Sequence, residues 1–142
     1  MIVLDTNIIS PLMEDEPDRT VLDWLDRLPR EQLWLTAISL FELRYGIEIL
    51  ATGRRRHALE RGLARVVDQG FAGRILPLDA AAAATASVIA ADRRRAGRCV
   101  EIRDTLIAGI VVSQGADFAT RNVRHFEDLD VRVVNPWADA AG

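Results

Sequence analysis

Five short apolar runs recur along the chain with helix-like patterns between them, and this alternation constrains the fold more than any other feature. The runs are residues 1–4, 33–36, 74–78, 117–120 and 131–134. Several are almost wholly apolar, as is typical of strands that are covered on both faces. Strands that alternate with helices predict a parallel sheet with helices on both sides. We therefore expect an α/β protein, a three-layer α/β/α sandwich with a central parallel β-sheet.

Helix signals fill the stretches between these runs. Asp18, Thr36 and Asp79 are good N-cap residues, and each precedes a helical pattern. Gly115 follows another such pattern and suits the left-handed turn that ends many helices. The helices expected from these signals cover residues 21–28, 37–50, 54–69, 80–97 and 101–115.

No internal repeat, low-complexity tract or interdomain linker divides the chain. Its 142 residues are enough for one domain with its own core. We therefore expect a single domain over residues 1–137. The remaining segment, residues 138–142, is expected to fray after Trp137.

The charged residues and the cysteine content exclude several functions. The net charge is −3, so no basic field over the whole molecule indicates nucleic acid. All 18 basic side chains are arginine. This excludes Schiff-base chemistry, a P-loop lysine and a receiver-type phosphoacceptor domain, which all need an amine. The single cysteine, Cys99, excludes an internal disulfide and a multi-cysteine metal site.

The sequence shows neither the pattern of a signal peptide nor that of a membrane span. The apolar N-terminal run is short and ends in Asp5. The longest apolar stretch, residues 80–91, falls short of the roughly 20 residues that cross a bilayer. With no disulfide to suggest an oxidising compartment, we expect a cytoplasmic protein without a membrane partner.

The opening stretch MIVLDTN places an acid at the end of the first expected strand. In open parallel sheets, ligands bind beyond the carboxyl ends of the strands. Asp5 is therefore a candidate functional residue. The simpler interpretation, which these residues alone favour, is that Asp5 caps the helix that begins after it.

Two further acids stand out in helical patterns. Glu42 would share a helix face with Ser39 and Gly46, a small polar face with room for a ligand, in which Ser39 is a candidate supporting residue. Otherwise Glu42 is a surface glutamate. Asp104 precedes a strongly apolar helical stretch, where an acid also complements the helix dipole by about 0.3–1 kcal/mol. Glu101 lies one turn earlier and points in roughly the same direction.

The segment ATRNVRHF, residues 119–126, offers several polar side chains after a short expected strand. The simpler interpretation is that Asn122 caps a short helix. His125 and His57 are the two candidate general bases. A lone histidine is more often a surface or hydrogen-bonded residue. The polar side chains of this segment include Thr120, Arg121, Asn122 and His125.

If Asp5, Glu42 and Asp104 converge, their charges need compensation. Two unit charges about 4 Å apart repel by roughly 4 kcal/mol at an effective dielectric of about 20. Three carboxylates must therefore share protons or bind a cation. Oxygen ligands without cysteine or paired histidines suit Mg²⁺ or Mn²⁺ rather than Zn²⁺.

Four sequence blocks resemble, in order and spacing, the motif blocks of PIN-domain proteins and above all of VapC-like ribonuclease toxins. They are VLDTNIIS, AISLFELRYGIEIL, RDTLIAGI and ATRNVRHFEDLDVRVVNPW. The resemblance runs from Met1 to Trp137. It implies a PIN-like sandwich fold and metal-dependent endoribonuclease activity with Mg²⁺, for which Mn²⁺ can substitute. It also implies the toxin of a type II toxin–antitoxin system: a homodimer that binds a small antitoxin protein.

The same resemblance assigns roles to individual residues. Asp5, Glu42 and Asp104 match the metal-binding, catalytic acids of the family. Other matching positions carry polar residues that support the first acid or open the last block. These are Thr6, Asn7 and Thr120.

One part of the family pattern is missing from this chain. Many relatives carry an acid where Asn122 or His125 stands, and here both positions lack one. Asn122 can instead hold a metal-bound water through its amide oxygen, and Glu101 can supply charge. Arg103 replaces the small residue expected before Asp104 and is a candidate phosphate contact.

The resemblance leaves the RNA contacts and one rival function open. Five arginines are candidates for binding RNA, and the alternative interpretation is that they lie on a solvated helix face. They are Arg54, Arg55, Arg56, Arg103 and Arg121. DNA contact is expected only through the antitoxin, because the chain contains no recognition helix. The rival function is a catalytically weak PIN-like binding protein that acts through its antitoxin complex, by partner docking and promoter autoregulation.

Overall fold

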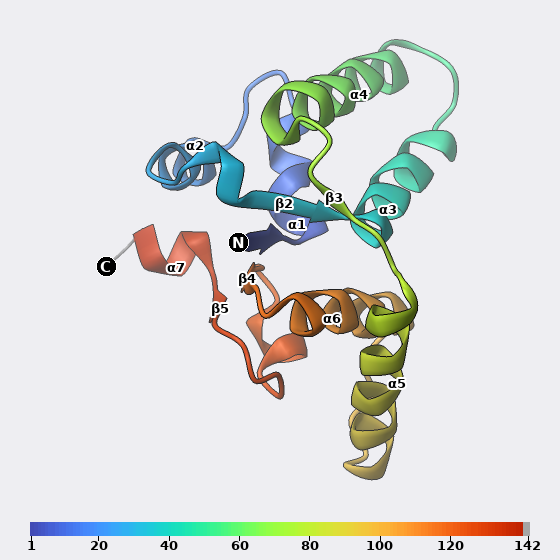
Figure 1. Ribbon diagram of the computed structural model, residues 1–142. Coiled ribbons are helices and arrows are strands. Elements are labelled where there is room, and N and C mark those ends of the chain that lie inside the picture. The colour runs from blue at the N-terminus through green and yellow to red at the C-terminus, as the bar shows by residue number, and fades with distance from the viewer. Residues whose placement is uncertain (141–142) are drawn as a thin grey trace.

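The computed structural model describes residues 1–140, which build a five-stranded parallel sheet between two layers of helices (Figure 1). The strand order is β3-β2-β1-β4-β5, and every neighbouring pair is parallel. The predicted α/β/α sandwich is therefore confirmed. The strands are β1 (Ile2–Leu4), β2 (Leu33–Thr36), β3 (Ile75–Leu76), β4 (Asp117–Ala119) and β5 (Val133–Val134).

Helices and short helical turns connect these strands. The α-helices are α1 (Thr6–Ile9), α2 (Arg19–Asp26), α3 (Ala37–Glu48), α4 (Arg54–Arg65), α5 (Ala80–Arg95), α6 (Ile102–Gln114) and α7 (Pro136–Ala140). The shorter turns are η1 (Ser10–Met13), η2 (Arg30–Gln32), the π-helical η3 (Val66–Phe71) and η4 (Val123–Phe126). In the described part of the chain, every helix is too short or too polar to cross a membrane.

The predicted helix-capping residues are confirmed by their hydrogen bonds and backbone conformation. The side chains of Asp18, Thr36 and Asp79 each accept from the backbone N–H three residues later, at the starts of α2, α3 and α5. Gly115 ends α6 with φ of 61°, the left-handed conformation that glycine adopts without strain. Local capping chemistry therefore sets where α2, α3 and α5 begin and where α6 ends.

Several stretches differ from the sequence prediction. The helix expected over 54–69 ends at Arg65 and continues as η3, in which Gly70 weakens regular α-helix. The run 74–78 forms only the two residues of β3, since Pro77 cannot donate a ladder hydrogen bond. Residues 138–140 continue α7, where a tail was expected. Residues 141–142 lie outside the described part, so the extent of the domain stays a prediction.

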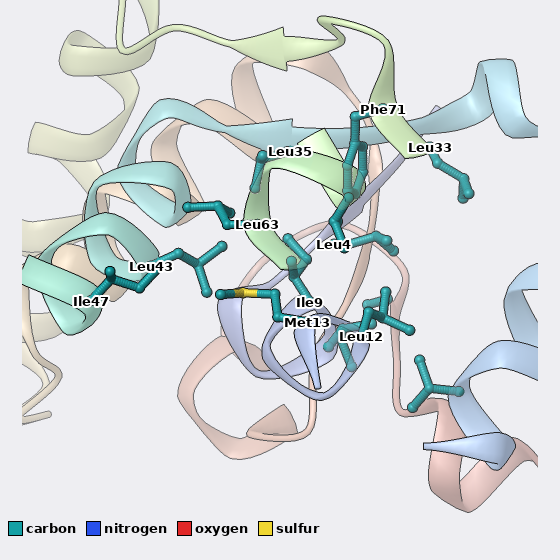
Figure 2. Close-up of a cluster of buried hydrophobic side chains, with 14 residues drawn as sticks. Leu4, Ile9, Leu12, Met13, Leu33, Leu35, Leu43, Ile47, Leu63 and Phe71 are labelled. Carbon is teal, nitrogen blue, oxygen red and sulfur yellow. The ribbon is translucent and has the colours of Figure 1, made fainter. Parts of the chain in front are cut away.

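Strand β1 is buried on both of its faces. Val3 packs into a cluster that includes Ile107 of α6, on one side of the sheet. Leu4 packs on the other side, into the cluster of Figure 2, where Leu35 of β2 and Leu63 of α4 also lie. Val3 and Leu4 are 0% and 1% exposed. This double burial accounts for the wholly apolar start of the chain and puts β1 in the centre of the sheet.

Candidate active site

A cavity of about 510 Å³ opens at the carboxyl edge of the sheet, and Asp5, Glu42 and Asp104 all line it. Asp5 follows β1 directly, Glu42 lies in α3, and Asp104 lies in the first turn of α6. The structure thus brings three acids from three separate elements to one cavity. Its other lining residues are Thr6, Asn7, Ser10, Pro11, Glu14 and Asn122.

Asp5 is almost fully buried, with 4% of its surface exposed. Its Oδ1 accepts from the backbone N–H of Thr6 at 2.8 Å, and it is the N-cap of α1. Its Oδ2 accepts from the Thr120 hydroxyl at 2.8 Å and from the Asn7 amide at 3.3 Å. The capping interpretation of Asp5 is therefore confirmed, and the same carboxylate also lines the cavity.

The buried position of Asp5 disfavours its charged form. Burial raises the pKa of Asp5 to about 6, and the nearby carboxylates of Asp104 and Glu42 also raise it. Hydrogen bonds from Thr120 and Thr6 act in the opposite direction. The cavity is consequently a place where negative charge is costly and a cation is favoured.

Glu42 is held by groups on either side of its carboxylate. Its Oε1 accepts from the Thr6 hydroxyl at 3.1 Å, and Nη1 of Arg103 lies 3.8 Å from Oε2. Burial raises the pKa of Glu42, and the charges of Asp104 and Glu101 raise it further, whereas Thr6 and Arg103 lower it. Glu42 is therefore a partly buried site residue and not a surface glutamate.

Asp104 reaches the cavity from the start of α6. Its Oδ2 lies 3.0 Å from Nδ1 of His125, in η4. Asn122 also lines the cavity, and its side chain makes no capping hydrogen bond to η4. Asn122 thus holds the predicted N-cap position of η4, but its side chain does not cap the helix and is available to the cavity.

The loop after β4 is tied to the start of α1 by a polar network. The buried hydroxyl of Thr120 accepts from the Asn122 backbone N–H at 3.0 Å and from the Asn7 amide at 3.4 Å. The side-chain carbonyl of Asn7 accepts from the backbone N–H of Arg121 at 3.0 Å. Thr6, Asn7 and Thr120, expected to support the acids, each donate a hydrogen bond to one of them.

Several candidate residues do not line the cavity, among them Ser39, Glu101 and His57. Ser39 is fully buried and bonds to Thr36 within the cap of α3. Glu101 caps α6 and pairs with Nε of Arg103 at 3.0 Å. His57 lies exposed on α4. A residue that shares a helix face or the sign of its charge with a residue of the cavity therefore need not line the cavity itself.

Most of the candidate RNA-binding arginines already have partners within the chain. Arg55 makes two hydrogen bonds to Glu14, of 2.9 and 3.1 Å. Arg56 pairs with Glu48 and Glu60, and the guanidinium of Arg121 lies 4.2 Å from the centre of the Trp137 ring. Arg103 contacts Glu101 and Glu42. Arg54, at the start of α4, is exposed.

Sequence reasoning missed Glu14 and Arg93. Glu14 lines the cavity from the loop after η1, and no periodicity marks a loop residue of this kind. Arg93 is 3% exposed, although it stands in a run of three arginines, and charge runs are usually solvated. Arg93 lies two helical turns after the buried Ala86, and this seven-residue spacing was the available signal.

The three acids line the cavity without forming a compact ligand cluster. Among residues 1–140, no group of three or more His, Cys, Asp or Glu side chains stands close enough to hold one ion in the present arrangement. The site is thus defined by a shared cavity, by burial and by mutual repulsion of its carboxylates.

Comparison with known proteins identifies the family. A PIN-domain profile matches residues 2–131. The chain is 39% identical, over 140 residues, to VapC ribonuclease Y4jK of Sinorhizobium fredii. This alignment covers 99% of this chain and 100% of that protein. It is 37% identical, over 139 residues, to Toxin FitB of Neisseria gonorrhoeae, with 98% and 100% covered.

A solved structure described as FitAB bound to an IR36 DNA fragment contains a similar chain. It superimposes with a TM-score of 0.85 at 36% identity and covers 96% of each chain. The chain therefore belongs to the PIN-domain family, among the VapC/FitB-type toxins of toxin–antitoxin systems.

Proposed function

We propose that the chain is a type II toxin that acts as a metal-dependent endoribonuclease and hydrolyses RNA phosphodiester bonds. The observation that carries the proposal is the cavity shared by Asp5, Glu42 and Asp104. The Sinorhizobium relative, which is similar over its whole length, is named a ribonuclease, and this supports the same reaction.

We take these three acids as ligands of Mg²⁺, for which Mn²⁺ can substitute. Carboxylate oxygens are the donors that both hard cations prefer, and the cavity lining described here contains neither histidine nor cysteine. Burial and repulsion between the acids raise the pKa of Asp5 to about 6. A cation relieves that repulsion, so the residues fit it by charge and by donor type.

When bound, the metal would polarise a phosphate and activate a water molecule. The chain's own residues prepare the site for it. Hydrogen bonds from Thr120 and from the Thr6 backbone favour the ionised form of Asp5. The Thr6 hydroxyl orients Glu42, and the Asn122 amide can hold a water molecule in the cavity.

Two arginines are placed to meet the RNA backbone. Arg103 contacts Glu42, Arg55 contacts Glu14, and both of these acids line the cavity. An arginine beside a carboxylate can exchange that partner for a phosphate, because a guanidinium binds either group through bidentate hydrogen bonds. We propose that Arg103 and Arg55 contact phosphates that flank the scissile bond. The side chains of Arg56 and Arg121 also have partners within the chain, but those partners do not line the cavity.

We further propose that the chain forms a homodimer with a small cognate antitoxin and contacts DNA only through that antitoxin. The FitAB structure, bound to a DNA fragment, supports an assembly of this kind.

The test is the cleavage of a total small-RNA pool by the purified chain in Mg²⁺, in Mn²⁺ and in EDTA. Asp5→Asn and Asp104→Asn are the site variants. Asp92→Asn is the matched control, because Asp92 is an exposed acid on α5 that pairs with Arg95. Discrete cuts by wild type and by the control, which disappear in EDTA and in both site variants, are expected.

Cleavage that persists in both site variants would overturn the assignment of the acids. If neither wild type nor any variant cleaves RNA while the chain still binds its antitoxin, the proposed enzyme activity is wrong and the rival function takes its place. The chain would then be a catalytically weak binding protein whose acidic cavity docks a partner.

A further inference from the structure

His125 approaches the site in a different way from the residues that line it. Its Nδ1 lies 3.0 Å from Oδ2 of Asp104, yet it is not part of the cavity lining. Its side chain is 51% exposed. A carboxylate oxygen accepts this hydrogen bond when Nδ1 of His125 carries the hydrogen, so the direction of the contact depends on the tautomer of the ring. His125 therefore reaches the cavity only through Asp104.

The backbone of His125 is fixed by a buried cation. Nη2 of Arg93 donates to the His125 carbonyl at 2.7 Å. The same guanidinium holds both carboxylate oxygens of Asp128, at 2.8 and 2.9 Å, and donates to the Thr105 hydroxyl at 2.8 Å. Thr105 follows Asp104 in α6. One side chain thus ties the end of α5, the first turn of α6 and η4 together.

We propose that His125 is a positioning residue of the site. Its Nδ1–H orients the Asp104 carboxylate by holding one oxygen and leaves the second oxygen for the cavity, while Arg93 fixes the place of His125. The inference rests on the proposed metal-dependent function. Ligand-orienting hydrogen bonds of this kind commonly change metal affinity by about 10- to 100-fold when they are removed.

The exposure of the ring separates this role from simple packing. Half of the His125 side chain faces solvent, so its removal leaves no buried void. A loss of metal affinity in a His125 variant would accordingly report the contact with Asp104 rather than a disturbed core.

The test compares His125→Asn with His125→Leu. Asparagine keeps an N–H donor at the same number of bonds from the backbone as Nδ1, whereas leucine keeps the bulk and loses the donor. Mn²⁺ binding is measured by electron paramagnetic resonance without RNA. We expect His125→Leu to bind Mn²⁺ about tenfold more weakly than wild type, and His125→Asn to keep most of the affinity. Wild-type affinity in His125→Leu, or equal weakening in both variants, would overturn the proposal.

A second readout needs neither metal nor activity. Nitrogen NMR of the imidazole in the metal-free protein should show the hydrogen of His125 on Nδ1, and a neutral ring with its hydrogen on Nε2 would refute the proposal. An RNA cleavage assay distinguishes a failure of the nuclease proposal from a failure of the proposal for His125. If wild type cleaves RNA, Asp5→Asn does not, and His125→Leu matches wild type in both cleavage and Mn²⁺ affinity, the nuclease stands and only the role of His125 fails.

Discussion

The hydroxyl of Thr120 donates a 2.8 Å hydrogen bond to Asp5 across 115 positions of the sequence. The contact follows from strand pairing. Leu4 of β1 lies opposite Ala119 of β4, so the next residues of the two parallel strands emerge side by side. Thr120 is fully buried. The pair therefore holds the central acid of the site in place and lowers the cost of its charge.

Replacement of Thr120 by valine should raise the pKa of Asp5 above its value of about 6, because the hydrogen bond that favours the ionised form is lost. Valine preserves the shape of threonine, and Thr120→Ser preserves the hydroxyl as the matched control. Carbon NMR titration of the Asp5 carboxyl in EDTA measures the pKa of Asp5 in both variants. An unchanged pKa in Thr120→Val would show that the hydroxyl does not stabilise the carboxylate.

Asp5 should also make the stability of the metal-free protein depend on pH. Its pKa is about 6 in the folded chain against 3.8 as the reference value. The folded state binds the proton more tightly, so this stabilisation is complete below about pH 4 and is lost as the pH rises through 6. The difference corresponds to about 3 kcal/mol. Asp5→Asn removes this titration.

Urea unfolding in EDTA at pH 4.5 and pH 8 tests this dependence. The stability of Asp5→Asn relative to wild type should be greater at the higher pH. A relative stability that is the same at both pH values would contradict the raised pKa. Saturating Mn²⁺ should stabilise wild type more than the variant, because a ligand of the folded state stabilises it by mass action.

The predictable parts of the site are those set by local sequence. The position of Asp5 at the end of a strand was predicted from the apolar run before it, and the helix caps were predicted from their residue types. Because parallel strands end at one edge of the sheet, Thr120 and Asp5 could be expected near each other. The resemblance to PIN-domain proteins supplied the grouping of Glu42 and Asp104 with them.

The unpredicted parts depend on contacts between elements that are distant in sequence. The pairing of Arg93 with Asp128 has no local mark in the sequence, since charge runs are usually solvated and the spacing from Ala86 indicates only the burial of Arg93. The location of Glu14 depends on how the loop after η1 folds back toward α4, where Arg55 holds it. Ser39 shows the converse error, because it was expected to support the site beside Glu42, whereas its hydroxyl bonds to the cap of its own helix.

The buried guanidinium of Arg93 and its partly exposed partner Asp128 should be important for stability. Asp128→Asn leaves the guanidinium, which is 3% exposed, without its countercharge, and removing one partner of a buried charge costs about 3–5 kcal/mol. We expect the lower end, about 3 kcal/mol, because the Asn oxygen and the His125 carbonyl still accept from the guanidinium. Arg93→Met should cost less, since the Asp128 side chain is 27% exposed and can turn toward water. Urea unfolding at pH 7 measures both variants, and equal stability of Asp128→Asn and wild type would contradict the expectation.

The same pair predicts a loss of stability in acid. The Arg93 guanidinium lowers the pKa of Asp128 from 3.8. This stabilisation is present above about pH 4 and is lost as the pH falls through the lowered pKa. Wild type should therefore lose more stability than Arg93→Met between pH 5 and pH 2. Parallel acid curves of the two proteins would be inconsistent with a depressed pKa at Asp128.

The close approach of α5 and α6 should make Gly109 intolerant of a side chain. A methyl group added at Gly109 would lie 2.5 Å from the Cβ of Ala86 and 2.7 Å from the backbone oxygen of Ala82. Overpacking of this kind typically costs about 1–3 kcal/mol. Because α6 carries Asp104 in its first turn, Gly109→Ala should also reduce metal-dependent cleavage.

Gly46→Ala is the matched control for this prediction. Gly46 also lies inside a helix, α3, but an added methyl group would meet no atom within 4 Å. Alanine should therefore stabilise the protein there by about 0.5–1 kcal/mol, through the lower entropy of the unfolded chain. Urea unfolding of the two variants should give shifts of opposite sign. Shifts of the same sign would mean that helix propensity, and not the contact with Ala86, decides the effect at Gly109.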